Sequence, residues 1–253
     1  MIVIPMAGSS RRFTQAGYVV PKYMLDLRGR PLFDWAVASF SGSFSDETFL
    51  FIVRDVQGTP DFVAARAAAL GIADYRIVEL DRITAGQAET VELGLQQAEI
   101  DDDTALAIFN IDTIRPHLDP SPMLGFAGWL EVFRTAGDNW SFVEPAKDDP
   151  ARVARTTEKQ RISDLCCTGL YQFARTALFL EALAAERAAP SSHELFAAPL
   201  YNHLIARGEA IGWREVSTDD VILSGVPAEY EALLRDLPPA LLALEGAMPA
   251  AAQ

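Results

Sequence analysis

The stretch PMAGSSRRFTQAGYVVPKYML, residues 5–25, directly follows the short apolar run Ile2–Ile4. A run of this kind is typical of a buried strand. Small residues come next, then two adjacent arginines, a stretch without apolar periodicity, and Pro21–Lys22. Small residues let backbone N–H groups approach a ligand closely, and the basic side chains add positive charge. The opening of the chain therefore predicts a strand followed by an anion-binding loop.

Apolar runs and helical patterns alternate through the first half of the chain. This alternation is the signature of a sheet covered by helices, with ligands gathered at the carboxyl ends of its strands. It predicts an α/β fold, Rossmann-like, with a mixed, mostly parallel sheet flanked by helices. We expect strands at 2–6, 48–54, 75–79 and 105–110, and helices at 31–41, 59–71 and 86–98.

After Asp112 the rhythm changes, and residues 113–138 are interpreted as a loop. We expect a single domain over residues 1–253, made of two halves, 1–112 and 113–237, and a tail, 238–253, that holds a short helix. The elements expected in the second half are strands at 139–144, 151–157, 166–174 and 210–217, and helices at 175–187, 192–206 and 227–237.

The charge balance restricts the partners of the chain. Its 253 residues carry 21 Lys and Arg against 35 Asp and Glu, a net charge of −14, which argues against nucleic acid and anionic membrane surfaces because both select for basic patches. No apolar run is long enough to span a membrane and no signal peptide is visible, so we expect a cytoplasmic protein. The sequence leaves open whether the chain forms a homo-oligomer.

The opening loop matches neither of the two best-known phosphate motifs. Both G-x-x-x-x-G-K-[ST] and G-x-G-x-x-G are absent, because Gly8 is followed by two serines and the next glycine is Gly17. Pro21 still restricts the backbone beside Lys22, so that a polyphosphate held by this loop would meet a cation of limited freedom. The alternative is a solvated surface loop whose cations pair with nearby carboxylates.

The residues of this loop resemble the signature of the nucleotidyltransferase superfamily that includes the sugar-1-phosphate nucleotidylyltransferases, roughly A-G-x-G-[ST]-R followed by P-K. Ala7, Gly8, Arg12 and Pro21–Lys22 match in order, whereas Ser10 replaces the second glycine and Arg11 the Ser/Thr. AGY before P-K and FDWAVASF after it are similar to the branch of capsule and surface-polysaccharide gene products. The resemblance implies a nucleotide-diphospho-sugar transferase fold, GT-A-like, with 1–112 binding nucleotide and 113–237 binding acceptor.

The resemblance also implies a nucleotide site. Ala7, Gly8, Ser9 and Ser10 would contact the phosphates, and in TAGQAETVELGL, residues 84–95, Gly86 and Gln87 would border the base. Glu89 and Thr90 in that stretch are interpreted as ordinary helix-start residues. Asp112, which ends the apolar strand in ALAIFNIDTI, resembles the metal-binding aspartate of the family, and a hard carboxylate oxygen suits Mg²⁺ bound to nucleotide phosphates.

The stretch VEPAKDDPARVARTTEKQRISDLCCTGLYQF, residues 143–173, is similar to the acceptor half of such enzymes. By that resemblance Glu144 would contact acceptor hydroxyls, Lys159 the acceptor phosphate, and Thr168 and Gly169 the acceptor body. Tyr171 is interpreted as a core residue.

The weakest match lies near the C-terminus. VILSGVPAEYEALL, residues 221–234, resembles a G-T-P-E-D-Y segment that many members precede with a second metal aspartate. Leu223 occupies that position here. Asp219 or Asp220 could substitute, or the metal could rely on Asp112 with water and phosphate ligands, and the spacing does not decide between them.

The implied reaction is Mg²⁺-dependent transfer of a nucleotidyl group from an NTP to a small phosphorylated acceptor, with release of pyrophosphate. Arg12 would hold the β- and γ-phosphates and Lys22 the α-phosphate. Gln87 suits a pyrimidine edge as well as others, so a pyrimidine is favoured without being settled. Two alternatives stay open: a nucleotide-binding regulatory relative without turnover, and a GT-A glycosyltransferase, although Asp101–Asp103 precedes its strand and is interpreted as a solvated turn.

Overall fold

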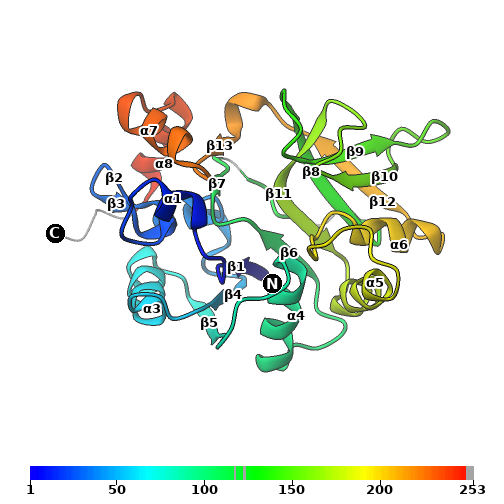
Figure 1. The fold of residues 1–253 in the computed structure, drawn as a ribbon, viewed down its shortest axis with the longest axis horizontal. Coiled ribbons are helices and arrows are strands. Elements are labelled where there is room, and N and C mark those ends of the chain that lie inside the picture. The colour runs from blue at the N-terminus through cyan, green and yellow to red at the C-terminus, as the bar shows by residue number, and fades with distance from the viewer. Residues whose placement is uncertain (117, 122–123, 249–253) are drawn as a thin grey trace. The chain divides into compact units, whose positions relative to one another are not determined.

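The computed structural model describes residues 1–116, 118–121 and 124–248 (Figure 1). Within this part of the chain, no helix is long and apolar enough to cross a membrane. The chain divides into two compact units. The N-terminal unit comprises the described residues of 2–83, 110–120 and 219–253, and the central unit comprises Met1 together with those of 84–109 and 121–218.

The N-terminal unit is built on a parallel group of strands in which β4 pairs with both β1 and β5. The sequence TFLFIV of β4 is buried from Phe49 onward, as its aromatic and β-branched residues favour. Helix α3 ends at Gly71, whose φ of 80° is the left-handed conformation common at helix C-termini. The main elements are β1 (Ile2–Pro5), α1 (Arg11–Gln15), β2 (Asp26–Leu27), β3 (Arg30–Pro31), α2 (Leu32–Ala38), β4 (Thr48–Val53), α3 (Thr59–Leu70), β5 (Asp74–Glu79), β7 (Thr113–Ile114), β13 (Ile222–Leu223), α7 (Pro227–Arg235) and α8 (Pro239–Ala247).

The central unit is organised around β11, a strand whose nine residues are all buried. It pairs antiparallel with β6, β8 and β9, while β8 pairs in parallel with β12. Helices α5 and α6 pack against each other beside these strands (Figure 1). The elements of this unit are α4 (Gln87–Gln97), β6 (Leu106–Phe109), β8 (Gly128–Arg134), β9 (Ser141–Pro145), β10 (Val153–Glu158), β11 (Leu165–Phe173), α5 (Thr176–Ala188), α6 (Leu200–Ala206) and β12 (Ile211–Glu215).

The structure confirms the predicted α/β fold of mixed β-structure flanked by helices, and it also contains the predicted short helix of the tail, α8. Residues 249–253 of that tail lie outside the described part. Two predictions are wrong. The predicted helix at 192–206 begins only at Leu200, because the backbone of Leu195 instead hydrogen-bonds to Ala85 and Ala88. The predicted loop at 113–138 contains β8, a strand buried through Phe133.

Candidate functional site

The anion-binding loop predicted from the sequence leaves the end of β1 and enters a short helix. Ala7 is buried, whereas Gly8 and Ser9 are exposed. Ser10 precedes α1 with a φ of 48°, in the left-handed region that favours glycine. The position where the family signature has its second glycine therefore has a glycine-like backbone, although it carries a serine.

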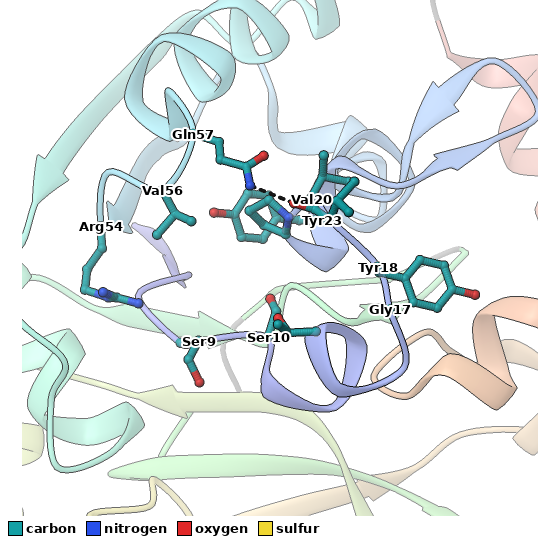
Figure 2. A pocket seen from close by; sticks show the side chains of 13 residues that line it. Ser9, Ser10, Gly17, Tyr18, Val20, Tyr23, Arg54, Val56 and Gln57 are labelled. Atoms are coloured by element: carbon teal, nitrogen blue, oxygen red, sulfur yellow. Dashed lines mark hydrogen bonds between the residues drawn. The ribbon is translucent and has the colours of Figure 1, made fainter.

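A pocket of about 470 Å³ lies between this loop and the residues that follow β4 (Figure 2). One wall of the pocket is formed by Arg54, a residue that was not predicted from the sequence to belong to the site. Its Nε donates a hydrogen bond of 2.8 Å to the carbonyl oxygen of Ala7, at the base of the loop. Gln57 closes another side by donating a 2.6 Å hydrogen bond to the carbonyl of Val19. The remaining walls are formed by Gly8, Ser9, Ser10, Thr14, Gly17, Tyr18, Val20, Pro21, Tyr23 and Val56.

Lys22 and Asp112 lie together, although 90 residues separate them in the chain. The Lys22 ammonium nitrogen is 2.6 Å from Asp112 Oδ2, and their side chains are 20% and 29% exposed. Burial alone would raise the pKa of Asp112. The charge and hydrogen bond of Lys22, helped by the charge of Arg12, outweigh it and hold this pKa below its ordinary value. Asp112 is therefore an anion at neutral pH, with Lys22 against it and Arg12 close enough to act on it.

The segment before α7 packs directly against Asp112. The Ser224 backbone N–H donates a 2.9 Å hydrogen bond to the carbonyl oxygen of Asp112. A Cβ atom on Gly225 would lie 2.9 Å from Asp112 Oδ2, closer than real Cβ contacts allow. Glu229 accepts hydrogen bonds from the backbone N–H groups of Gly225 and Val226, at 2.7 and 3.1 Å, and so fixes this turn. Gly225 thus leaves room for the carboxylate of Asp112.

The donor set around Asp112 limits how a metal could be held. Leu223, at the position of the expected second aspartate, pairs with Thr113 in the β7–β13 ladder. Over the described residues, no three or more His, Cys, Asp or Glu side chains gather into a metal-binding group. One ionised, partly exposed carboxylate fits Mg²⁺, which commonly takes one or two protein carboxylates and completes its shell with phosphate oxygens and water.

Gly86 and Gln87, predicted to border the nucleotide base, lie in the central unit, where Gln87 begins α4. A Cβ on Gly86 would clash with the backbone of Leu195, so the close backbone approach at this glycine is made by Leu195. Glu89 accepts a hydrogen bond from the Ala85 N–H, and the Thr90 hydroxyl donates one of 3.1 Å to the Gly86 carbonyl. The interpretation of these two residues as helix-start residues is confirmed.

The four predicted acceptor residues have different surroundings in the central unit. Glu144 pairs with Arg155 at 3.0 Å on β9 and β10, and Thr168 is buried and donates a 3.1 Å hydrogen bond to Glu131. Gly169, with a φ of 99°, lies where the register of β11 against β8 shifts. Lys159 is exposed at the end of β10. Their roles toward an acceptor stay predictions.

Glu158, next to Lys159, is a second residue that sequence reasoning missed. Burial raises its pKa above the ordinary value, although a hydrogen bond from Ser141 and the charge of Lys159 act in the opposite direction. Ser141 also hydrogen-bonds to the hydroxyl of Tyr171 at 3.1 Å. Tyr171 is buried, which confirms its interpretation as a core residue. In the sequence, the position of Glu158 directly before Lys159 could have identified it as a candidate residue.

Solved structures of other proteins share this fold. A crystal structure of a nucleoside-diphosphate-sugar pyrophosphorylase from Vibrio cholerae RC9 is 46% identical, with a TM-score of 0.89, and the match covers 93% of this chain and 100% of that one. The inositol-1-phosphate CTP transferase from T. maritima is 14% identical over 98% of this chain and 96% of that one, with a TM-score of 0.73. A putative glucose-1-phosphate thymidylyltransferase from Bacillus anthracis is 17% identical over 93% and 95%, with a TM-score of 0.68. No protein-family model matches the chain, and no curated protein does.

The fold is of the α/β class, in which the strand at the N-terminus leads into a small-residue loop, and an arginine, a lysine and an aspartate lie together beside that loop. The identity of 46% across nearly the whole chain is specific enough to give the family. The chain belongs to the nucleotidyltransferases, among the sugar-nucleotide pyrophosphorylases. The resemblance of the opening loop to this superfamily is thereby confirmed.

Proposed function

We propose that this nucleotidyltransferase joins an NTP, with a pyrimidine base favoured, to a sugar phosphate or another small phosphorylated acceptor, for the synthesis of surface-polysaccharide precursors. The observation that carries the proposal is the contact of Lys22 with Asp112 beside the loop that starts at Ala7. The 46% identical relative is named for a nucleoside-diphosphate-sugar substrate, which favours a sugar phosphate as the acceptor.

The proposed reaction is an in-line displacement at the α-phosphorus of the NTP. An oxygen of the acceptor phosphate forms a bond to the α-phosphorus while the bond to the bridging oxygen of the β-phosphate breaks, and pyrophosphate leaves with that electron pair. Because the acceptor phosphate is already ionised near neutral pH, the enzyme needs no general base. Its task is to position two anions and to stabilise the charge that develops between them.

The N-terminal unit provides the groups for the triphosphate. The backbone of Ala7, Gly8, Ser9 and Ser10 would lie along it, Arg12 would bind the β- and γ-phosphates, and Lys22 would stabilise the α-phosphate in the transition state. Asp112 would hold Mg²⁺, which when bound neutralises phosphate charge. The pocket wall formed by Arg54 would add a further cation to this site.

The central unit provides the groups for the base and the acceptor. Gly86 and Gln87 would border the base, and Lys159 would bind the incoming phosphate. Glu144 would contact the acceptor hydroxyls, and Thr168 and Gly169 the acceptor body. Glu158 is a further candidate for the hydroxyls, because it neighbours Lys159 whereas the Glu144 carboxylate is already paired with Arg155. The Thr168 hydroxyl, turned toward buried Glu131, would act through its remaining acceptor capacity.

Two other functions remain distinguishable by experiment. A regulatory relative would bind NTP without releasing pyrophosphate, and a GT-A glycosyltransferase would consume a sugar nucleotide instead. Against the latter, Asp101–Asp103 is exposed in a turn before β6, as predicted, and is not placed after a strand as the D-x-D motif of that class requires.

The test is pyrophosphate release with Mg²⁺, with CTP, UTP, dTTP, ATP and GTP each screened against a pooled set of sugar phosphates and other phosphorylated acceptors. We expect release with a pyrimidine nucleotide and a sugar 1-phosphate, and none after chelation by EDTA. Nucleotide binding without release across the whole panel would favour the regulatory alternative. Release of nucleoside diphosphate from a sugar nucleotide would favour the glycosyltransferase.

A further inference from the structure

The segment 189–199 connects α5 to α6 in the central unit and is fixed at its start by a buried carboxylate. Glu186 is 2% exposed, and its Oε1 accepts hydrogen bonds of 2.6 Å from both the backbone N–H and the hydroxyl of Ser191. Its other oxygen, Oε2, lies 2.6 Å from His203 Nε2 on α6. The segment is therefore attached to both helices, although it forms no regular structure itself.

Two neighbouring residues of this segment contact the two predicted substrate subsites of the central unit. Leu195 donates a 3.0 Å hydrogen bond to the Ala85 carbonyl and accepts one of 2.9 Å from the Ala88 N–H, on either side of Gly86. The ring of the next residue, Phe196, lies beneath Lys159, whose ammonium nitrogen is 4.3 Å from the ring centroid. One dipeptide thus contacts both the turn at Gly86 and the acceptor lysine.

The surroundings of Lys159 make this ring contact significant. Its backbone has a left-handed φ of 54°, and its N–H donates a 2.8 Å hydrogen bond to the Trp140 carbonyl, so the start of the side chain is fixed. Among the described residues, its ammonium makes no ion pair, in a chain with 35 acidic residues. The aromatic face of Phe196 therefore orients this cation without a direct carboxylate contact, although the charge of Lys159 acts on the neighbouring Glu158.

We propose that Phe196 is a positioning residue that holds the Lys159 ammonium ready for the acceptor phosphate, on a segment that Leu195 anchors by its backbone hydrogen bonds to Ala85 and Ala88. The inference rests on the proposed function. An ammonium group has three N–H donors. A ring on one side leaves the donors on the other sides available to a phosphate, so the contact persists in the complex and reduces the motion that the acceptor must arrest.

The test compares Phe196→Leu, which keeps apolar bulk but removes the aromatic face, with Phe196→Tyr, which keeps that face. We expect Phe196→Leu to raise the acceptor KM about two- to fivefold, which corresponds to the loss of an exposed cation–π contact. The kcat and the NTP KM should be nearly unchanged. Phe196→Tyr should retain the wild-type acceptor KM. A merely structural role would instead lower the melting temperature and change both KM values in both variants.

A double-mutant cycle isolates the pair. In a Lys159→Met background, Phe196→Leu should have no further effect on the acceptor KM. An unchanged acceptor KM in Phe196→Leu, or the same increase with and without Lys159, would overturn the proposal.

A measurement without turnover separates this inference from the proposed function. The chain has three lysines, Lys22, Lys147 and Lys159, so reductive ¹³C-methylation gives few NMR signals. The signal lost in Lys159→Met should show an aromatic ring-current shift that is absent in Phe196→Leu and present in Phe196→Tyr, and titration with glucose 1-phosphate should move it. A ring-current shift without pyrophosphate release from any substrate pair would reject the proposed function alone. If the wild-type enzyme releases pyrophosphate but its Lys159 signal shows no ring-current shift, only the role of Phe196 would be rejected.

Discussion

Two of the three lysines, one in each unit, are held in opposite ways. Lys22 in the N-terminal unit lies 2.6 Å from a carboxylate oxygen of Asp112. Lys159 in the central unit lies over the ring of Phe196 and makes no ion pair with the described residues. One ammonium is thus neutralised by its neighbour, and the other is oriented by a group that carries no net charge.

The difference indicates two ways of holding an anion in a protein with a net charge of −14. An ammonium already paired with Asp112 adds little net attraction for a distant anion, but it is held in place for a transition state whose charge develops next to it. An ammonium over a ring keeps its charge available and suits capture of an incoming phosphate. We therefore expect changes at Lys22 to affect mainly kcat and changes at Lys159 to affect mainly acceptor binding.

The strongest test of this contrast is Lys22→Met. One preorganised charged contact to a transition state is typically worth about 3 to 4 kcal/mol, so we expect kcat to fall about 10²- to 10³-fold. The measurement is pyrophosphate release, together with circular dichroism and the melting temperature to show that the fold is retained.

The matched control is Lys147→Met, at an exposed bend after β9, which should leave turnover unchanged. Lys22→Arg keeps the charge next to Asp112 and should be as stable as the wild type, while its turnover reports the need for a point charge of lysine geometry. A folded Lys22→Met enzyme with near-normal kcat would contradict the role proposed for this residue.

Lys159→Met should produce the opposite kinetic pattern. Hydrogen bonds to charged groups contribute roughly 1.5 to 3 kcal/mol, so the acceptor KM should rise about 10- to 100-fold. The NTP KM should stay within about twofold because Lys159 is proposed to bind the acceptor phosphate and not the triphosphate. Steady-state kinetics with each substrate varied in turn gives both constants. If kcat and the NTP KM fell together with no change in the acceptor KM, the two lysines would not have separate roles.

Gly225→Ala tests the space around Asp112 without removing any charge. The new Cβ would lie 2.9 Å from Asp112 Oδ2, so the carboxylate must move away from its place beside Lys22. We expect kcat to fall about tenfold with little loss of stability, since the displaced group is the end of a partly exposed side chain. Gly42→Ala is the control, because nothing lies within 4 Å of a Cβ there. Equal activity of the two variants would show that Asp112 tolerates displacement.

Local sequence patterns predicted most of the elements that carry these residues. The apolar runs that became β1 and β4 and the helix that ends at Gly71 are determined by nearby residues, so their signals are readable in the chain. The loop signature likewise identified Lys22, and its order with Asp112 along the chain suggested a common site.

Other features of the fold and of the site depend on contacts between residues far apart in the chain, which local sequence patterns do not predict. Strand β8 has a charged residue, Glu131, in the middle of an apolar run, and it is buried because Arg214, 83 residues away, donates a hydrogen bond to it. The segment around Leu195 looked helical, but its backbone bonds to residues far earlier in the chain. Arg54 belongs to no motif, and only the pocket beside the opening loop singles it out.

The smallest effect is expected at Ser10, where a left-handed backbone carries a side chain. Ser10→Gly removes a Cβ from the loop beside the phosphates, so we expect the NTP KM to fall about two- to threefold, because glycine permits closer approach to a ligand. Stability should change by less than about 1 kcal/mol, since the relief of backbone strain is offset by greater freedom of the unfolded chain.

Ser10→Ala keeps the Cβ but loses the hydroxyl, whose oxygen lies 3.4 Å from the backbone nitrogen of Lys22. An NTP KM that falls in the glycine variant and stays constant in the alanine variant attributes the effect to the Cβ. A rise in both variants would instead show that the hydroxyl, through its contact with Lys22, helps to hold the loop for the nucleotide.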